Sequence, residues 1–134
     1  MTAFPLRIVT PDGLEFEGQA EELIVRTTSG DIGILAGHIN CVAPLGMGKA
    51  TVVIDGKKRY AACIGGMLSV MNGAVTLVPT TFEWADEIDA QRAERSYQRA
   101  QDMLSHKDSS DTDIRLAQAR LRRALVRKSV AGDQ

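Results

Sequence analysis

The sequence predicts an N-terminal antiparallel β-sandwich, or flattened barrel, over residues 1–84, followed by a C-terminal antiparallel two-helix hairpin over 87–131. Eleven of the twelve glycines and all four prolines lie in residues 1–79, and neither residue type occurs from 85 to 131. Apolar runs between turn residues fill the first part, whereas apolar residues recur near helical spacing in the second. A 134-residue chain has the length of one domain, or of one small domain with an appendage.

The strands are predicted from alternating patterns and from the turns between them. Segments 6–10, 14–17 and 22–27 alternate or are β-rich, and turn residues separate them. Asp55-Gly56 separates 51–54 from 57–61, and Asn72-Gly73 separates 67–71 from 74–78. These dipeptides favour two-residue hairpin turns, which need positive φ at both positions. We expect Pro79 to end the last strand, because proline cannot donate to a ladder.

Two helices are predicted in the second part. The first runs from about 87 to 104, with Asp86 and Glu87 at its start, and the second runs to about 129 after a cap at 111–113. The polar linker 105–110 is short, which indicates an antiparallel hairpin. The apolar stripes are narrow and rich in alanine, so we expect modest packing and a hairpin that can open. These stripes are Ile88, Ala93, Tyr97, Ala100 and Leu104, then Ile114, Ala117, Leu121, Ala124 and Leu125.

Composition excludes several function classes. A net charge of −1 and a pI near 6.1 argue against a general nucleic-acid binder. No apolar run has the length of a membrane span, and the N-terminus shows no secretory signal. Cys41 and Cys63 match no metal spacing, so we expect both to be reduced and buried. His38 and His106 lie in unlike contexts, and no phosphate loop or nucleophile motif is present. Gly65-Gly66 is interpreted as a strand bend.

The helical part carries basic residues at regular spacing. Residues 112–134 hold six basic and two acidic side chains, a local net charge of +4. Guanidinium groups suit phosphate oxygens, although such stripes are more often solvated, salt-bridged faces. The two stripes, each spaced i, i+3, i+7, are Arg92, Arg95 and Arg99, and Arg120, Arg123 and Arg127.

Three segments of the β part carry a family resemblance. They are IVTPDG at 8–13, SGDIGILAGH at 29–38 and GGMLSV at 65–70, of which the second is the most specific. With them, the whole chain resembles the epsilon subunit of bacterial rotary ATP synthases. Ala36 stands where that family usually has proline, which leaves the assignment standing.

The resemblance implies a non-catalytic subunit of the rotating central stalk. Its β domain would bind the gamma subunit and the membrane c-ring, with Ser29, Gly30, Asp31 and His38 as the contact residues. The hairpin would lie folded or extend into the alpha/beta catalytic head, where it blocks ATP hydrolysis. The subunit would be peripheral to the membrane, at the cytoplasmic face of a bacterial cell.

The resemblance also implies a regulatory ATP site on the folded hairpin, with no required cofactor. The family motif Ile/Leu-Asp-x-x-Arg-Ala matches residues 88–93 in full. ATP would favour the folded, non-inhibitory state. The residues implied in ATP binding are Glu83, Ile88, Asp89, Arg92, Ala93, Arg99, Arg123 and Arg127.

Three other functions remain open from the sequence. A purely structural coupling subunit would bind gamma without responding to nucleotide. A small β-sandwich enzyme is disfavoured because no nucleophile–base pair or metal set is present. A nucleic-acid binder is disfavoured because residues 1–84 hold six basic and eight acidic residues.

Overall fold

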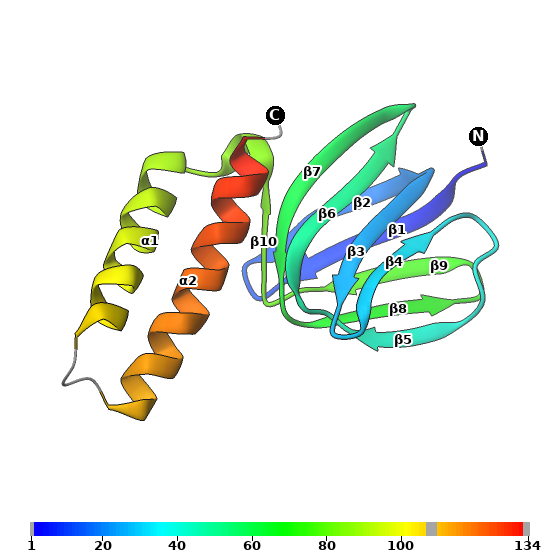
Figure 1. Ribbon diagram of the computed structural model, residues 1–134. Helices are drawn as coiled ribbons and strands as arrows, with labels where there is room; N and C mark the ends of the chain where they lie inside the picture. The colour runs from blue at the N-terminus through cyan, green and yellow to red at the C-terminus, as the bar shows by residue number, and fades with distance from the viewer. Residues whose placement is uncertain (1, 107–109, 133–134) are drawn as a thin grey trace.

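The structure, a computed structural model, describes residues 2–106 and 110–132. In this part of the chain, ten strands precede a short 3-10 helix and two α-helices (Figure 1). The elements are β1 Phe4–Thr10, β2 Gly13–Ala20, β3 Glu22–Thr27, β4 Gly30–Ile34, β5 Cys41–Pro44, β6 Met47–Ile54, β7 Lys57–Ile64, β8 Met67–Met71, β9 Ala74–Val78, β10 Thr81–Trp84, η1 Ala85–Glu87, α1 Ala90–Ser105 and α2 Asp111–Ala131.

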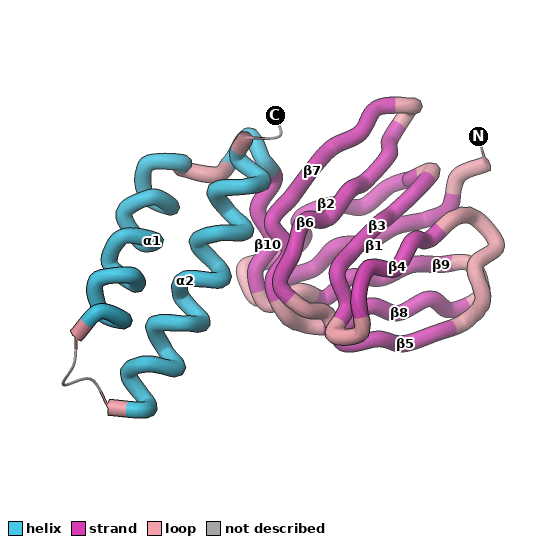
Figure 2. The backbone as a smooth tube through the Cα atoms, in the orientation of Figure 1, coloured by secondary structure: helices cyan, strands magenta, loops and turns pink. Residues whose placement is uncertain are grey.

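The strands form two five-stranded sheets that face each other, which confirms the predicted sandwich (Figure 2). Their orders are β2-β1-β9-β8-β5 and β10-β7-β6-β3-β4. Neighbouring strands are antiparallel, except that β1 and β9 pair in parallel. Alternate residues of each strand point inward. The core between the sheets is therefore built from fully buried aliphatic side chains, among them Leu6, Ile8, Leu23, Leu68 and Leu77.

Asp55-Gly56 and Asn72-Gly73 form the predicted hairpin turns, since Asp55 and Asn72 both have φ of 51°. Pro79, however, does not end the last strand. It ends β9, and β10 follows it and pairs with β7. The strands β4, β5 and β10 were not predicted. All three lie at sheet edges and have only four or five residues, so their alternation of buried and exposed positions is too short to stand out in the sequence.

Gly65-Gly66 joins β7 in one sheet to β8 in the other, as the predicted bend requires. Gly66 has φ of +95°, a region that side-chain-bearing residues rarely occupy. A methyl group there would overlap the carbonyl oxygen of Val78 and lie 2.6 Å from Cα of Pro79. Only glycine fits at this crossing.

The helix boundaries differ from the prediction at both N-termini. Asp86 and Glu87 lie in η1, and α1 is capped by Asp89, whose carboxylate accepts from the backbone N–H of Arg92 at 3.0 Å. Similarly, Ser110 caps α2 by accepting from the backbone N–H of Asp113 at 3.1 Å. The adjacent acidic residues match the same cap pattern, so sequence alone does not select between them. Residues 107–109 of the predicted linker lie outside the described residues.

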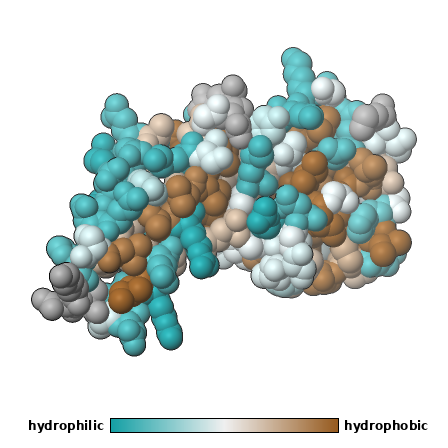
Figure 3. All heavy atoms as spheres, viewed as in Figure 1, coloured by the Kyte–Doolittle hydropathy of each residue, from teal (hydrophilic) through white to brown (hydrophobic). Residues whose placement is uncertain are grey.

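The two helices are antiparallel and contact each other through small side chains. Ala93 and Ala100 of α1 and Ala117 and Ala124 of α2 are buried. Figure 3 shows hydrophobic residues along the hairpin, flanked by hydrophilic ones. Leu125, predicted to lie in the apolar stripe, is exposed.

The hairpin docks on the sandwich through the C-terminal end of α2. Val130 is fully buried there, against Ala62 of β7 and against Ala85 and Ile88 at the start of the hairpin. Tyr60, Val126 and Ala131 complete this contact, which we call the docking cluster. Neither helix, within the described residues, combines the length and hydropathy of a membrane span.

The two cysteines differ in environment. Both are free, but Cys41 is only half-buried, so the prediction that both are buried is wrong for this residue. Cys41 lies on the edge strand β5, which has no neighbour on its outer side. Burial in the core raises the pKa of Cys63 to about 12.

Candidate functional site: the hairpin groove

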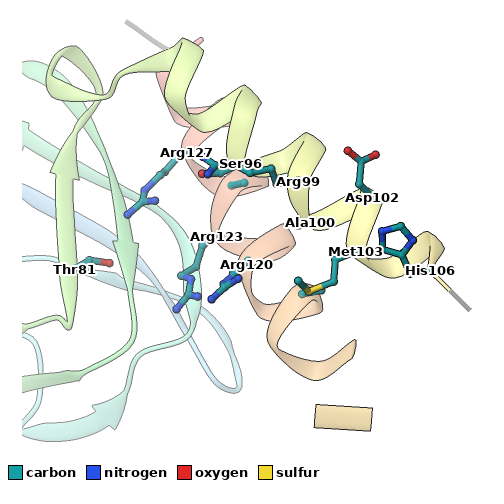
Figure 4. A pocket seen from close by; sticks show the side chains of 12 residues that line it. Thr81, Ser96, Arg99, Ala100, Asp102, Met103, His106, Arg120, Arg123 and Arg127 are labelled. Atoms are coloured by element: carbon teal, nitrogen blue, oxygen red, sulfur yellow. The ribbon is translucent and has the colours of Figure 1, made fainter. Parts of the chain in front are cut away.

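Two adjoining pockets lie between the hairpin and the sandwich, and together we call them the hairpin groove; Figure 4 shows the larger one. The larger has a volume of 730 Å³ and the smaller 340 Å³. Thr81 of β10, Ser96 of α1 and Arg127 of α2 line both pockets, so the two are continuous. The larger pocket is lined by the hairpin and by Thr81 of β10, whereas the smaller is shared more evenly by the two, so the whole groove is complete only when the hairpin lies against β10.

All eight residues that the resemblance implied in ATP binding line this groove. Glu83, Ile88, Asp89, Arg92 and Ala93 line the smaller pocket, Arg99 and Arg123 line the larger, and Arg127 lines both. They come from β10, the segment after η1, and both helices. The structure thus brings together residues that are far apart in the sequence. Glu83 and Arg127, which form a hydrogen bond, are 44 positions apart.

The larger pocket is strongly basic. Arg99, Arg120, Arg123 and Arg127 line it, against one carboxylate, that of Asp102. Arg120 and Arg123 have no carboxylate partner within residues 2–106 and 110–132. Clustered guanidinium groups without counter-charges favour an anionic ligand, above all phosphate, which they bind in a bidentate manner.

One ion pair crosses the groove. Nε of Arg127 lies 2.7 Å from Oε1 of Glu83 and joins α2 to β10. Its side chains remain 31% and 35% exposed, so this pair stabilises the docked hairpin by only about 0–1 kcal/mol. The pair holds Arg127 at the junction of the two pockets.

The hydroxyl of Thr81 has no hydrogen-bond partner although it is buried, and it is the one such side-chain atom in the described part of the chain. Sequence reasoning missed this residue. It also missed Ser96 and the place of Arg120 in the groove, although the i, i+3, i+7 stripe had singled out Arg120. Only the docking of the hairpin shows that Thr81 faces the arginines.

A second set of contacts holds the helices to each other. Nζ of Lys128 lies 2.6 Å from Oε2 of Glu94 and 4.1 Å from the ring centre of Tyr97. Gln98 donates to the same carboxylate at 3.1 Å. These hydrogen bonds, first that of Lys128 and then that of Gln98, lower the pKa of Glu94.

The predicted contact residues of the β domain separate into two places. Ser29 lies in the turn between β3 and β4, Gly30 begins β4, and the carboxylate of Asp31 pairs with Nε of Arg26 at 2.6 Å. His38 lies beyond the other end of β4, where its Nδ1 is 2.8 Å from the carbonyl oxygen of Ile39. The structure does not bring His38 to the turn, and the contact role of all four residues stays a prediction.

Comparison with known proteins matches both parts of the chain. The β-sandwich domain of the ATP synthase delta/epsilon chain matches residues 3–85, and the long α-helix domain of the same chain matches 86–132. The ATP synthase epsilon chain of Bacillus velezensis is 44% identical over 133 residues, covering 99% of this chain and 100% of that one. That of Bacillus subtilis is 45% identical over 132 residues, covering 98% and 99%.

Solved structures share the fold. A chain of the mitochondrial ATP synthase of Euglena gracilis superposes with a TM-score of 0.84 at 20% identity, covering 100% of this chain and 83% of that one. One from the central stalk and c-ring of the Tetrahymena thermophila enzyme gives 0.66 at 11% identity, covering 95% of both. With the family matches over almost the whole sequence, the chain belongs to the delta/epsilon chain family of the ATP synthases, as a non-catalytic subunit of the F-type enzyme.

Proposed function

We propose that this subunit binds ATP in the hairpin groove and that ATP thereby favours the folded hairpin. The observation that carries the proposal is that all eight residues implied by the resemblance line one groove, in which Arg123 and the neighbouring Arg120 have no carboxylate partner among the described residues. In the folded state α2 lies on the sandwich. Released from it, the hairpin would extend into the alpha/beta catalytic head and inhibit ATP hydrolysis.

The two pockets suit the two ends of a nucleotide. In the smaller pocket, Ile88 offers an apolar surface for a base, and the carboxylates of Glu83 and Asp89 offer acceptors for adenine or ribose donors. In the larger pocket, guanidinium groups can bind phosphate oxygens. The ligand would therefore run from the start of α1 along α2.

The position of the groove supplies the regulatory link. A ligand shifts a conformational equilibrium only by its difference in affinity for the two states. Glu83 and the rest of the β10 side of the groove are lost when α2 leaves β10, so an extended hairpin would have no complete site. At a concentration 100 times its Kd, such a ligand stabilises the folded state by about 2.7 kcal/mol.

The proposed role of the sandwich is to couple the rotor to the hairpin. It would bind the gamma subunit and the c-ring, with the turn at Ser29, Gly30 and Asp31 facing the ring and His38 making a separate contact. The subunit would then be peripheral to the cytoplasmic face of the membrane. The basic surface of α2 would contact the alpha/beta head when the hairpin is extended.

Titration of the isolated subunit with ATP by calorimetry tests the nucleotide site. We expect saturable binding that the Asp89→Ala, Arg92→Ala double variant loses and that Arg115→Ala keeps. Arg115 is an exposed arginine of α2 that does not line the groove, so it controls for loss of positive charge. The fluorescence of Trp84, which is buried beside Glu83, gives a second readout. No binding at millimolar ATP would leave a purely structural coupling subunit.

A further inference from the structure

The larger pocket extends beyond the motif residues. Arg120 lines it one turn of α2 before Arg123, and with Arg127 these residues form one row along the helix. Seven residues of helix span about 10 Å, at about 1.5 Å per residue. The row therefore runs from the junction of the two pockets to the far part of the larger one.

Thr81 faces this row from the other side of the groove. It lies on β10 and lines both pockets, and its buried hydroxyl has no partner. Figure 4 shows that hydroxyl pointing from β10 toward the space in which the guanidinium groups of Arg123 and Arg127 end. An unsatisfied buried hydroxyl costs free energy, which a ligand oxygen at this place would recover.

We propose that Thr81 and Arg120 belong to the ligand site and make it sensitive to the number of phosphoryl groups. The hydroxyl of Thr81 donates to the phosphoryl group at the junction of the pockets, which mono-, di- and triphosphates all carry. Arg120 binds the terminal group of a triphosphate, which a monophosphate does not reach. This inference rests on the proposed function.

Calorimetric titrations of the full chain with ATP, ADP and AMP test the role of Arg120. We expect Arg120→Ala to weaken ATP binding about 10- to 100-fold, the cost of one hydrogen-bonded charge contact, and to leave AMP binding unchanged. Arg115→Ala, on the same helix but outside the groove, should change neither. The ratio of ATP to AMP affinity is thus the diagnostic quantity.

The role of Thr81 is tested with two variants of nearly equal size. Thr81→Val removes the hydroxyl and should weaken ATP, ADP and AMP binding by a similar factor, about 5- to 10-fold. Its melting temperature without ligand should not fall, because the hydroxyl has no partner in the protein. Thr81→Ser should retain nucleotide affinity.

The outcomes separate this inference from the proposed function. If the unaltered subunit binds neither ATP nor inorganic tripolyphosphate, both fail. If it binds ATP, but Arg120→Ala keeps the full ATP-to-AMP ratio, the terminal subsite is overturned and the nucleotide site stands. If Thr81→Val binds as tightly as the unaltered subunit, the hydroxyl contact is overturned.

Discussion

The sandwich and the hairpin bury side chains of different size. In the sandwich, leucines, isoleucines and valines fill the space between the sheets, and Leu6, Leu23 and Leu77 are almost completely buried. Between the helices, four alanines occupy the corresponding positions. Burying a leucine stabilises a fold by about 1.5–3 kcal/mol, whereas an alanine methyl group contributes only about 0.8 kcal/mol. The smaller apolar contribution between the helices leads us to expect that the hairpin separates at lower cost than the two sheets do.

The two units also differ in how polar groups are used. The sandwich is held by main-chain ladders between strands, from β1 to β10. The ion pair Arg26–Asp31 joins two adjacent strands of the sandwich, whereas Arg127–Glu83 joins the hairpin to the sandwich and Lys128–Glu94 joins the two helices. Such exposed pairs are screened by salt and require an ionised carboxylate, so their contribution falls at high ionic strength and at low pH.

The largest loss of stability is expected from a substitution at Gly66, in the segment that joins one sheet to the other. Gly66→Ala places a methyl group against the carbonyl oxygen of Val78 at a positive φ, so it should destabilise the sandwich by about 4 kcal/mol or more. Urea denaturation measures the loss. Gly73→Ala is the matched control, since Gly73 also has positive φ but nothing within 4 Å. Equal losses of stability in the two variants would contradict the idea that the short distance between Gly66 and Val78 causes the loss.

A smaller effect is expected in the hairpin. Ala117→Leu overfills the contact between α1 and α2 and should cost about 1–3 kcal/mol, confined to the helices. Hydrogen exchange should show faster exchange in both helices and unchanged protection in β6 and β7. Leu116→Ala, at the neighbouring exposed position, controls for the change in helix sequence. Loss of protection throughout the sandwich would mean that the two units unfold together.

The smallest effect is expected from pH. The folded state lowers the pKa of Glu94 below its ordinary value of 4.5, so its contribution is complete above that pH and is lost as the pH falls through the lowered pKa. Hydrogen exchange of α1 between pH 6 and pH 3 measures this. Lys128→Met removes the ion-pair partner and should flatten the dependence. If the pH dependence of hydrogen exchange is equally large in Lys128→Met, it does not arise from the pair between Glu94 and Lys128.

Local chemistry predicted much of the fold. Asp-Gly and Asn-Gly specify their turns through φ alone, so the turns at 55–56 and 72–73 were found without knowledge of the sheets. The edge strands β4, β5 and β10 were missed, because each has only four or five residues and so carries too short an alternating pattern. Asp89 was missed as a cap since Asp86 and Glu87 offer the same chemistry. Burial of Ile88 in the docking cluster helps to place the start of α1 after it.

The candidate site, like the fold, was only partly predictable from the sequence. A motif resemblance located the eight residues implied in ATP binding, and helical spacing placed Arg120 and Arg123 on one stripe. Nothing local relates Thr81 to that stripe, because it lies on β10 and faces α2 only after the hairpin docks. When a site is shared by two segments, the residue on one segment leaves no periodic pattern in the sequence of the other.

The docking cluster has a consequence for the order of events during synthesis. Val130 and Ala131 cover Ala85 and Ile88, which leave the ribosome long before them. Domains fold as units as they emerge, so the sandwich can complete its ladders while α2 is still being made. The nascent subunit therefore passes through a stage in which its β domain is finished and the start of its hairpin is still uncovered.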